Sequence, residues 1–288
     1  MEVVPQFIVN ILIPASLYGM VAVGFSVVVR VTRMYHLAIG GLVLFSGYLL
    51  YSSRLAGMPW WLGIIIAILI TTFIGWFMGV AVFERFQEKR SVRVGSSVVA
   101  ALALLVFLEN GLLMYFGPGS KSVAHVWDVH HAVGSAIVTD LEIVIVVVSM
   151  LVSGMVWLFL HATRFGKALR AIADNAEVAA VVGIDLQKGR GFAWALAAFL
   201  AGIAGIFYAL EYTLIPAQAS AMAINVFFRS ILGGVGSVPG ALAGSLLLET
   251  AEQATALWIS STFKFLTAAV MVVAVLLWRP SGIFGIKK

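Results

Sequence analysis

Polar side chains that could line a transport path stand inside apolar stretches of this sequence. Six of them are ionisable or amide side chains: Glu109, Asn110, Glu211, Arg229, Glu249 and Glu252. A charge at mid-bilayer costs on the order of 3 kcal/mol, so such residues usually face protein or water and serve function. The alternative places Glu211 and Arg229 near an interface, and the two later glutamates at a helix end that reaches the outer face.

Other kinds of chemistry find little support. The chain has no cysteine and no G-x-x-x-x-G-K-[ST] string, and its nearest glycine-rich string, GGVGSVPG at 233–240, lacks the lysine of a P-loop. The outer loop 117–140 contains side chains that can ligate zinc, but their spacing matches no known site: His125, Asp128, His130 and His131. We therefore expect no metal, no cofactor and no catalytic constellation.

The elements that position these residues are apolar segments, several of which are long enough to cross a membrane. The 288 residues are 62% hydrophobic and 11% charged, whereas soluble domains carry about 25% charged residues. The segments lack the alternation of apolar and polar residues that barrel strands show, and several have about the ~20 residues that a spanning helix needs. The eight segments are 7–29, 37–51, 60–83, 95–116, 141–160, 192–210, 224–257 and 265–278. This predicts an all-α, polytopic membrane bundle forming one domain, 1–288.

Charge predicts how this bundle is oriented. Fourteen of the 18 Lys and Arg residues form four clusters: Arg30 and Arg33; Arg85, Lys89, Arg90 and Arg93; Arg164, Lys167, Arg170, Lys188 and Arg190; Arg279, Lys287 and Lys288. The positive-inside rule places these clusters in the cytoplasm when the N-terminus is outside. The C-terminus is then inside only if 224–257 enters and leaves by the same face, as a pair broken at 233–240. The net charge of +5 is thus explained by basic residues in the cytoplasmic loops of a protein in a lipid bilayer. We expect no nucleic-acid partner.

The loop 161–190 is too polar to span a membrane, and its pattern is too regular for an unstructured loop. Phe165, Leu169 and Ile172 share one helical face, with basic residues on another. Asp174 and Glu177 have the spacing of a capping box, so a second helix is expected over 175–182, ending at Gly183. The loop is either an ordinary interfacial helix pair or a docking element for a cytoplasmic partner.

This loop resembles the ATPase-coupling loop of branched-chain amino-acid ABC transporter permeases of the LivH/LivM type. Their pattern runs roughly R-x-G-x-A-x-R-A-x-A-x-[DN]-x-E-x-A-x-x-x-G-[IV]. Its places are filled by Arg164, Gly166, Ala168, Arg170, Ala171, Ala173, Glu177, Ala179, Gly183 and Ile184. The strings LGGVGSVPGALAGSLLLETAE and WRPSGIFG are similar to the family's broken segment and C-terminal pattern.

The first cytoplasmic turn departs from the family. Its usual N-F-A-H-G-E is replaced by H-L-A-I-G-G at 36–41, which bears on the identity of the substrate because this turn lies near the transport path of such permeases. The candidate path residues are His36, Gly40, Glu109, Asn110, Gly233, Gly234 and Gly236.

The resemblance implies a permease subunit of an ATP-driven importer for branched-chain or related small amino acids in a bacterial inner membrane. It implies two cytoplasmic ATP-binding subunits, a second permease (identical or related) and an extracytoplasmic binding protein, and no enzymatic activity in this chain. The alternative is an ion-coupled secondary transporter or channel that uses Glu109 and its neighbours.

Overall fold

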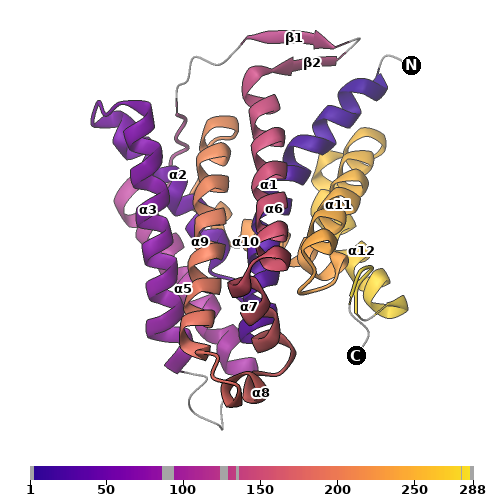
Figure 1. Ribbon diagram of the computed structural model, residues 1–288. Coiled ribbons are helices and arrows are strands. Elements are labelled where there is room, and N and C mark those ends of the chain that lie inside the picture. The colour runs from indigo at the N-terminus through magenta and orange to yellow at the C-terminus, as the bar shows by residue number, and fades with distance from the viewer. Residues whose placement is uncertain (1–2, 86–93, 124–128, 134–135, 280, 286–288) are drawn as a thin grey trace.

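The computed structural model describes residues 3–85, 94–123, 129–133, 136–279 and 281–285. They form the helical bundle that the sequence predicts (Figure 1). Its elements are α1 (Val3–Thr32), α2 (Ile39–Leu55), α3 (Trp60–Met78), the π-helical η1 (Gly79–Phe83), α5 (Val94–Phe116), α6 (Asp140–Ala162), α7 (Arg164–Asp174), α8 (Ala176–Val181), α9 (Leu186–Glu211), α10 (Gln218–Gly233), α11 (Val238–Trp258), the 3₁₀ turn η2 (Ser261–Phe263) and α12 (Lys264–Trp278).

The expected membrane segments are confirmed as helices. Six helices are long and apolar enough to cross a bilayer, and α10 with α11 forms a pair bent by 114°. The predicted segment 37–51 corresponds to α2, which has 17 residues. The chain is therefore a multi-pass membrane protein.

Two short strands depart from the all-α expectation. β1 (His130–Val133) pairs antiparallel with β2 (Ala136–Thr139), with His130 opposite Thr139. Thr139 then begins α6 through a capping box, because its hydroxyl accepts from the Glu142 amide and the Glu142 carboxylate accepts from the Thr139 amide. The hairpin lies at one end of the bundle, and α7 and α8 lie at the other (Figure 1).

The centre of the bundle is built from α1 and α9, whose apolar stretches are mostly buried, while α3, α5, α6 and α12 expose most of theirs. Small residues allow the close approach. A Cβ on Gly24 would lie 3.0 Å from Ala197 Cα, and one on Gly205 would lie 2.1 Å from the Val43 carbonyl oxygen. Glycine and alanine at such contacts let helix backbones pack closely where lipid gives no hydrophobic drive.

The prediction of a broken segment is confirmed, but its first helix starts earlier than expected. α10 begins at Gln218 rather than at 224, after Leu214 has formed an isolated bridge with Lys121. The corner between the two helices occupies 234–237, and Gly234 and Gly236 have φ of 101° and 92°. Only glycine adopts this backbone conformation without strain.

Residues near the C-terminus form hydrogen bonds with the end of α10, beside the corner. The Ile283 amide donates to the Leu232 carbonyl and the Phe284 amide to the Gly233 carbonyl, both at 3.0 Å. The two strings with a family resemblance, the glycine-rich one and the C-terminal one, are thus in direct contact. Of the four basic clusters, Lys89, Arg90, Arg93, Lys287 and Lys288 lie outside the described residues.

Candidate coupling loop and translocation path

The helix α7 is fixed to the bundle by its cap and its buried face. The Thr163 hydroxyl accepts a hydrogen bond from the Gly166 amide at 2.9 Å, which satisfies a free N–H of the first turn. A Cβ on Gly166 would lie 2.3 Å from the Phe159 carbonyl oxygen, so glycine is required where α7 turns back on α6. Of the three residues predicted to share one helical face, Leu169 and Ile172 are buried, whereas Phe165 is 39% exposed.

The short helix α8 has defined signals at both ends. Its cap is Asn175, whose Oδ1 accepts from the Glu177 and Val178 amides at 3.0 and 3.1 Å. The expected Asp174 cap is therefore wrong by one residue, because Asp174 still belongs to α7 whereas Asn175 is extended. At the other end the amides of Gly183 and Ile184 donate to Ala180 and Ala179, which is a Schellman motif.

Gly183 confirms the predicted end of this helix. Its φ is 85°, and a Cβ there would meet nothing within 4 Å. The glycine is thus required by backbone conformation alone, since this region of φ is unfavourable for L-residues with a Cβ.

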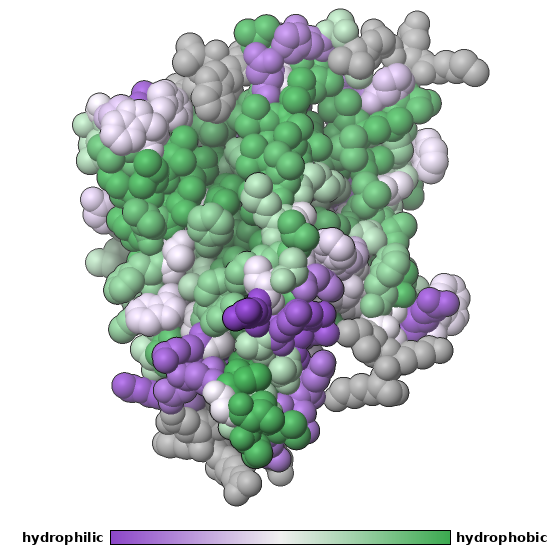
Figure 2. Space-filling view, viewed as in Figure 1, coloured by the Kyte–Doolittle hydropathy of each residue, from purple (hydrophilic) through white to green (hydrophobic). Residues whose placement is uncertain are grey.

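The outer face of α8 is apolar although a polar surface surrounds it. Val178, Val181 and Val182 are 58%, 87% and 68% exposed. Figure 2 shows a hydrophobic patch over α8 among the hydrophilic residues that gather at this end. A grouped apolar patch with a polar rim is typical of an interaction surface, which favours docking over an ordinary interfacial helix pair.

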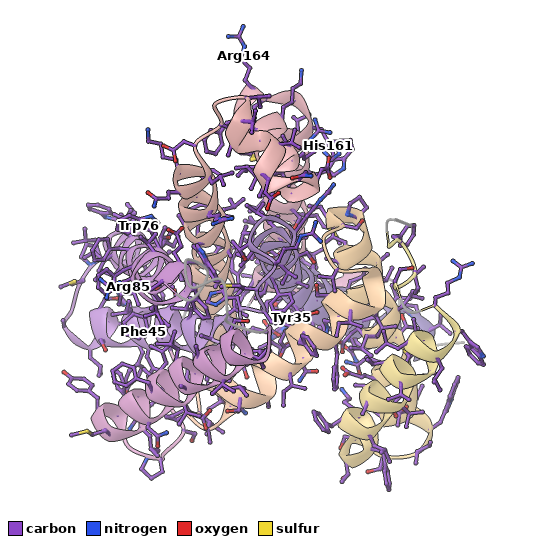
Figure 3. The ribbon with its side chains drawn as sticks, turned by 90° about the horizontal axis from the view of Figure 1, so that it is seen from below. Tyr35, Phe45, Trp76, Arg85, His161 and Arg164 are labelled. Atoms are coloured by element: carbon purple, nitrogen blue, oxygen red, sulfur yellow. The ribbon has the colours of Figure 1, made fainter. Side chains whose placement is uncertain are left out.

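The ten predicted coupling residues divide between anchoring positions and this surface. Those with little or partial exposure are Gly166, Ala173, Ala179, Ala168, Arg170, Ala171 and Ile184. The exposed ones are Arg164, Glu177 and Gly183. Figure 3 shows Arg164 projecting away from the bundle at this end.

Contacts with α9 and with the end of α1 hold the loop in place. Arg33 Nη2, after α1, donates to the Ala173 carbonyl at 2.6 Å, and a Cβ on Gly189 of α9 would lie 2.3 Å from Ile172 Cδ1. Asp185 caps α9 by accepting from the Lys188 amide at 3.0 Å. That amide, followed by the Lys188 ammonium, lowers the pKa of the Asp185 carboxyl.

Two of the predicted path residues meet at the beginning of α10. A Cβ on Gly40 would lie 2.5 Å from the Ala219 carbonyl oxygen. The half-buried Glu109 of α5 accepts hydrogen bonds from the Ser220 amide at 3.2 Å and from the Ser220 hydroxyl. Asn110 is exposed and donates to the carbonyl of Val106 in its own helix.

The other predicted path residues lie elsewhere. His36 is fully buried, with its ring edge-on to Trp194 and Phe83 at centroid distances of 4.9 and 5.9 Å. Gly233, Gly234 and Gly236 lie at the opposite end of α10, where they contact Gly240, the C-terminal residues and Arg30.

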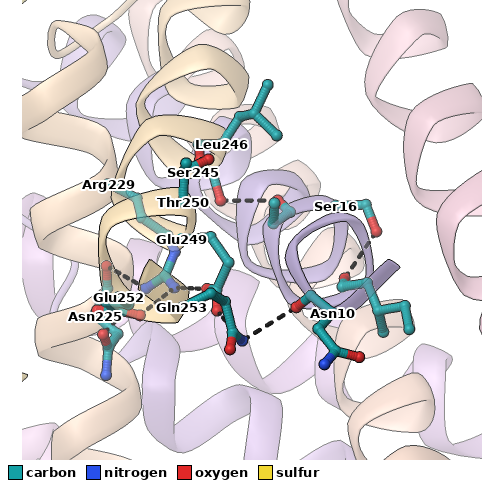
Figure 4. Close-up of polar contacts among 12 residues, drawn as sticks. Asn10, Ser16, Asn225, Arg229, Ser245, Leu246, Glu249, Thr250, Glu252 and Gln253 are labelled. Carbon is teal, nitrogen blue, oxygen red and sulfur yellow. Dashed lines mark hydrogen bonds and ion pairs between the residues drawn. The ribbon is translucent and has the colours of Figure 1, made fainter. Parts of the chain in front are cut away.

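A buried charge network joins α1, α10 and α11, and its arrangement was not expected. Arg229 is 1% exposed; its Nη2 contacts Glu249 and lies 3.3 Å from Glu252, while its Nη1 donates to Asn225 Oδ1 at 3.0 Å. The guanidinium carbon also lies 4.4 Å from the centre of the Tyr18 ring. Figure 4 shows the carboxylates of α11 converging on this arginine.

The sequence contained a signal for this network. Opposite charges stand in the two halves of one broken apolar segment, and the two glutamates are three residues apart, on one helical face. The sequence interpretation considered Arg229 and the two glutamates separately, and the 114° bend brings the two halves together.

The outer-loop histidines give no metal site among the described residues. His131 Nε2 lies 2.7 Å from Asp140 Oδ1, and His130 pairs across the hairpin with Thr139. His125 and Asp128 are outside the described residues.

Comparison with known proteins places this geometry in a family. Residues 7–275 match the model of the family described as "Branched-chain amino acid transport system / permease component". The chain belongs to this permease family. It is 27% identical to the high-affinity branched-chain amino acid transport system permease protein LivH of Escherichia coli (strain K12), with 94% of this chain and 92% of LivH aligned. It is 26% identical to the permease protein BraD of Pseudomonas aeruginosa, covering 97% and 95%.

A solved structure shares the fold of this permease. PsaBC from Streptococcus pneumoniae, in complex with a Fab, aligns with a TM-score of 0.51 at 12% identity, covering 94% of this chain and 91% of that one. The family expectation formed at the coupling loop is confirmed by the family match over residues 7–275.

Proposed function

We propose that this chain is the membrane-spanning permease subunit of an ABC importer for branched-chain or related small amino acids in a bacterial inner membrane. In this proposal an extracytoplasmic binding protein delivers the substrate. Two cytoplasmic ATP-binding subunits and a second permease chain, identical or related, complete the assembly. Support comes from family membership, from the names of LivH and BraD, and from the lack of a P-loop string in this chain.

The observation that carries the proposal is the apolar tip of α8. Val178, Val181 and Val182 are exposed at the end opposite the hairpin. Burying a valine side chain contributes about 1.5–3 kcal/mol, so three together favour a protein partner over water. We infer that an ATP-binding subunit covers them.

The loop is suited to transmit the motion of such a partner. Its two helices have capped ends, and Arg33 ties α7 to the end of α1. Packed elements respond to a displaced neighbour by moving as rigid bodies rather than by deforming. In the proposed mechanism, ATP closes the ATPase pair, the loop carries that movement to the spans, and access alternates between the two faces.

The proposed translocation path passes the beginning of α10. Gly40 permits α2 to touch this helix, and Glu109 binds Ser220 there. A carboxylate at this point is complementary to the ammonium group of an amino acid. His36 and the three glycines at the α10–α11 corner, Gly233, Gly234 and Gly236, then contribute to the packing around the path rather than lining it.

The test uses Val181→Asp in the chain reconstituted with its ATP-binding subunits and binding protein. A charge on this 87% exposed residue leaves folding intact, and the ATPase subunits should no longer copurify or drive uptake. Val129→Asp is the matched control, because Val129 is 56% exposed and directly precedes β1 of the hairpin. Normal ATP-driven uptake by Val181→Asp, or uptake driven by a proton or sodium gradient without ATPase subunits, would overturn the proposal.

A further inference from the structure

A separate pocket lies where the coupling loop meets the spans. It has a volume of about 300 Å³ and is bounded by the ends of α1 and α6, by α7, and by the corner that leads into α11. Its lining combines Arg30, His161 and Arg170 with Trp157, Leu160 and Pro239. Ligand pockets usually occupy about 300–1,000 Å³, so this one can take a small group such as a lipid headgroup.

The charges around this pocket favour an anion. Two arginines, Arg30 and Arg170, line it together with the hydrogen-bonding ring of His161, and no Asp or Glu is among its described lining residues. The pocket also contains Ser237, Val238 and Pro239, which form the N-terminus of the 21-residue helix α11. A helix N-terminus carries partial positive charge and attracts phosphate groups.

The donors around the pocket are only partly satisfied within the described residues. Arg170 Nε is buried without a hydrogen-bond partner, and Arg170 Nη2 reaches the His161 carbonyl only at 3.5 Å. His161 Nδ1 lies 2.8 Å from the Trp157 carbonyl. Arg30 donates to the Gly236 carbonyl at 3.2 Å, and Asp174, 3.9 Å from Arg30, is 76% exposed.

The position of the pocket indicates where an anion would come from. The Trp157 and His161 rings are tilted by 34° at a centroid distance of 4.8 Å, and α6 exposes Met155, Trp157 and Leu158. Tryptophan is enriched at the level of lipid headgroups. Figure 3 shows His161 and α7 at the margin of the bundle seen from this end.

We propose that this pocket binds the phosphate headgroup of an anionic phospholipid from the inner leaflet, between Arg30, Arg170 and His161. Basic pockets between membrane helices on the cytoplasmic side suit such headgroups. The acyl chains lie along the apolar face of α6. A bound headgroup fastens α7 to α1 and to the α10–α11 corner, so that the coupling loop moves together with the broken pair.

The binding itself does not depend on the proposed function, whereas its effect on coupling does. The experiment therefore measures lipid retention on the purified permease chain alone, by native mass spectrometry, without ATPase subunits. The probes are phosphatidylglycerol and phosphatidylcholine with the same acyl chains. We expect phosphatidylglycerol to be retained at least about ten-fold more tightly, because each arginine near an anionic headgroup contributes to the affinity.

Matched variants locate the site. Arg30→Gln with Arg170→Gln should abolish the preference for phosphatidylglycerol, and Arg170→Lys should retain most of it. Arg164→Gln removes the same charge from α7 at a side chain that projects away from the bundle (Figure 3) and does not line the pocket, and should leave the preference unchanged. Because the comparison of the two lipids on the unaltered chain needs no variant, a folding defect in the double variant does not block the test.

Three results would overturn the proposal. They are equal retention of the two lipids by the unaltered chain, an equal loss in the Arg164→Gln control, and displacement of the lipid by glycerol 3-phosphate at the same concentration as the lipid. The last would show that the site binds a soluble phosphate rather than a membrane lipid. Failure of ATP-driven uptake with intact lipid retention would count against the proposed function alone.

Discussion

Two regions of the molecule hold residues where their type is uncommon. The tip of α8 exposes apolar side chains, whereas the interior around Arg229 buries charged ones. At the tip, Val178, Val181 and Val182 are exposed on a polar surface. In the interior, Arg229, Glu249 and Glu252 are buried among apolar helices.

The two regions solve different problems. Exposed valines gain free energy only when a partner covers them, so they suit a contact with another chain. Buried charges already have their partners within the chain, and removing one leaves the others uncompensated. In the proposed function the first arrangement therefore serves assembly, whereas the second holds α10 against α11.

The largest effect should come from breaking the buried network. Arg229→Met leaves two carboxylates without their cation, which costs about 3–5 kcal/mol when a buried pair loses one partner. We expect the thermal unfolding midpoint of the purified chain to fall steeply. Arg229→Met combined with Glu249→Leu and Glu252→Leu removes all three charges and should regain most of the loss. Similar midpoints for the single and triple variants would contradict the pairing.

The second effect is at the end of α8. Gly183→Pro forces φ from 85° toward −65° and removes the amide that donates to Ala180, so the last turn of α8 should unwind. ATP-driven uptake should be lost while membrane insertion, measured by protease protection, remains normal. Gly183→Ala has room for its Cβ and bears only the backbone strain of about 1–2 kcal/mol. If the proline variant transports as well as the alanine variant, the shape of α8 has no role in coupling.

A smaller change in stability is expected from Glu177→Lys. Glu177 is exposed in the first turn of α8, where an acidic side chain contributes about 0.3–1 kcal/mol through the helix dipole. The unfolding midpoint should hardly move, whereas uptake should fall because the charge at the docking surface is reversed. Glu177→Gln is the control, with a smaller loss of uptake. A marked drop in the midpoint would place Glu177 in the fold rather than in the contact.

Sequence patterns were sufficient where the cause was local. Apolar length predicted the spans, Gly183 predicted the end of α8, and the glycines at 233–240 predicted the break. Even the error at the cap was small, because Asp174 and Asn175 are adjacent and both are good capping residues.

Contacts between distant segments could not be predicted in this way. Glu109 and Ser220 are 111 residues apart, and Gly40 meets Ala219 only because α2 and α10 are packed together. The hairpin was missed because its strands are four residues long and alternate too briefly to be distinguished from a loop. The arrangement around Arg229 required the bend, whose angle is not encoded in the glycines themselves.

The corner between α10 and α11 allows little bending. A Cβ on Gly233 would lie 1.8 Å from the Gly240 carbonyl oxygen, and one on Gly244 would lie 2.4 Å from the Arg229 carbonyl oxygen. The two helices are thus in contact through their backbones, and Arg229 with its carboxylates joins them further along. Because the corner is stiff, we expect α10 and α11 to turn as one unit. The 16 residues of α10 extend about 24 Å, so a small rotation of this unit about the corner, beside Arg30, would give a larger displacement at the far end of α10, beside Gly40 and Glu109.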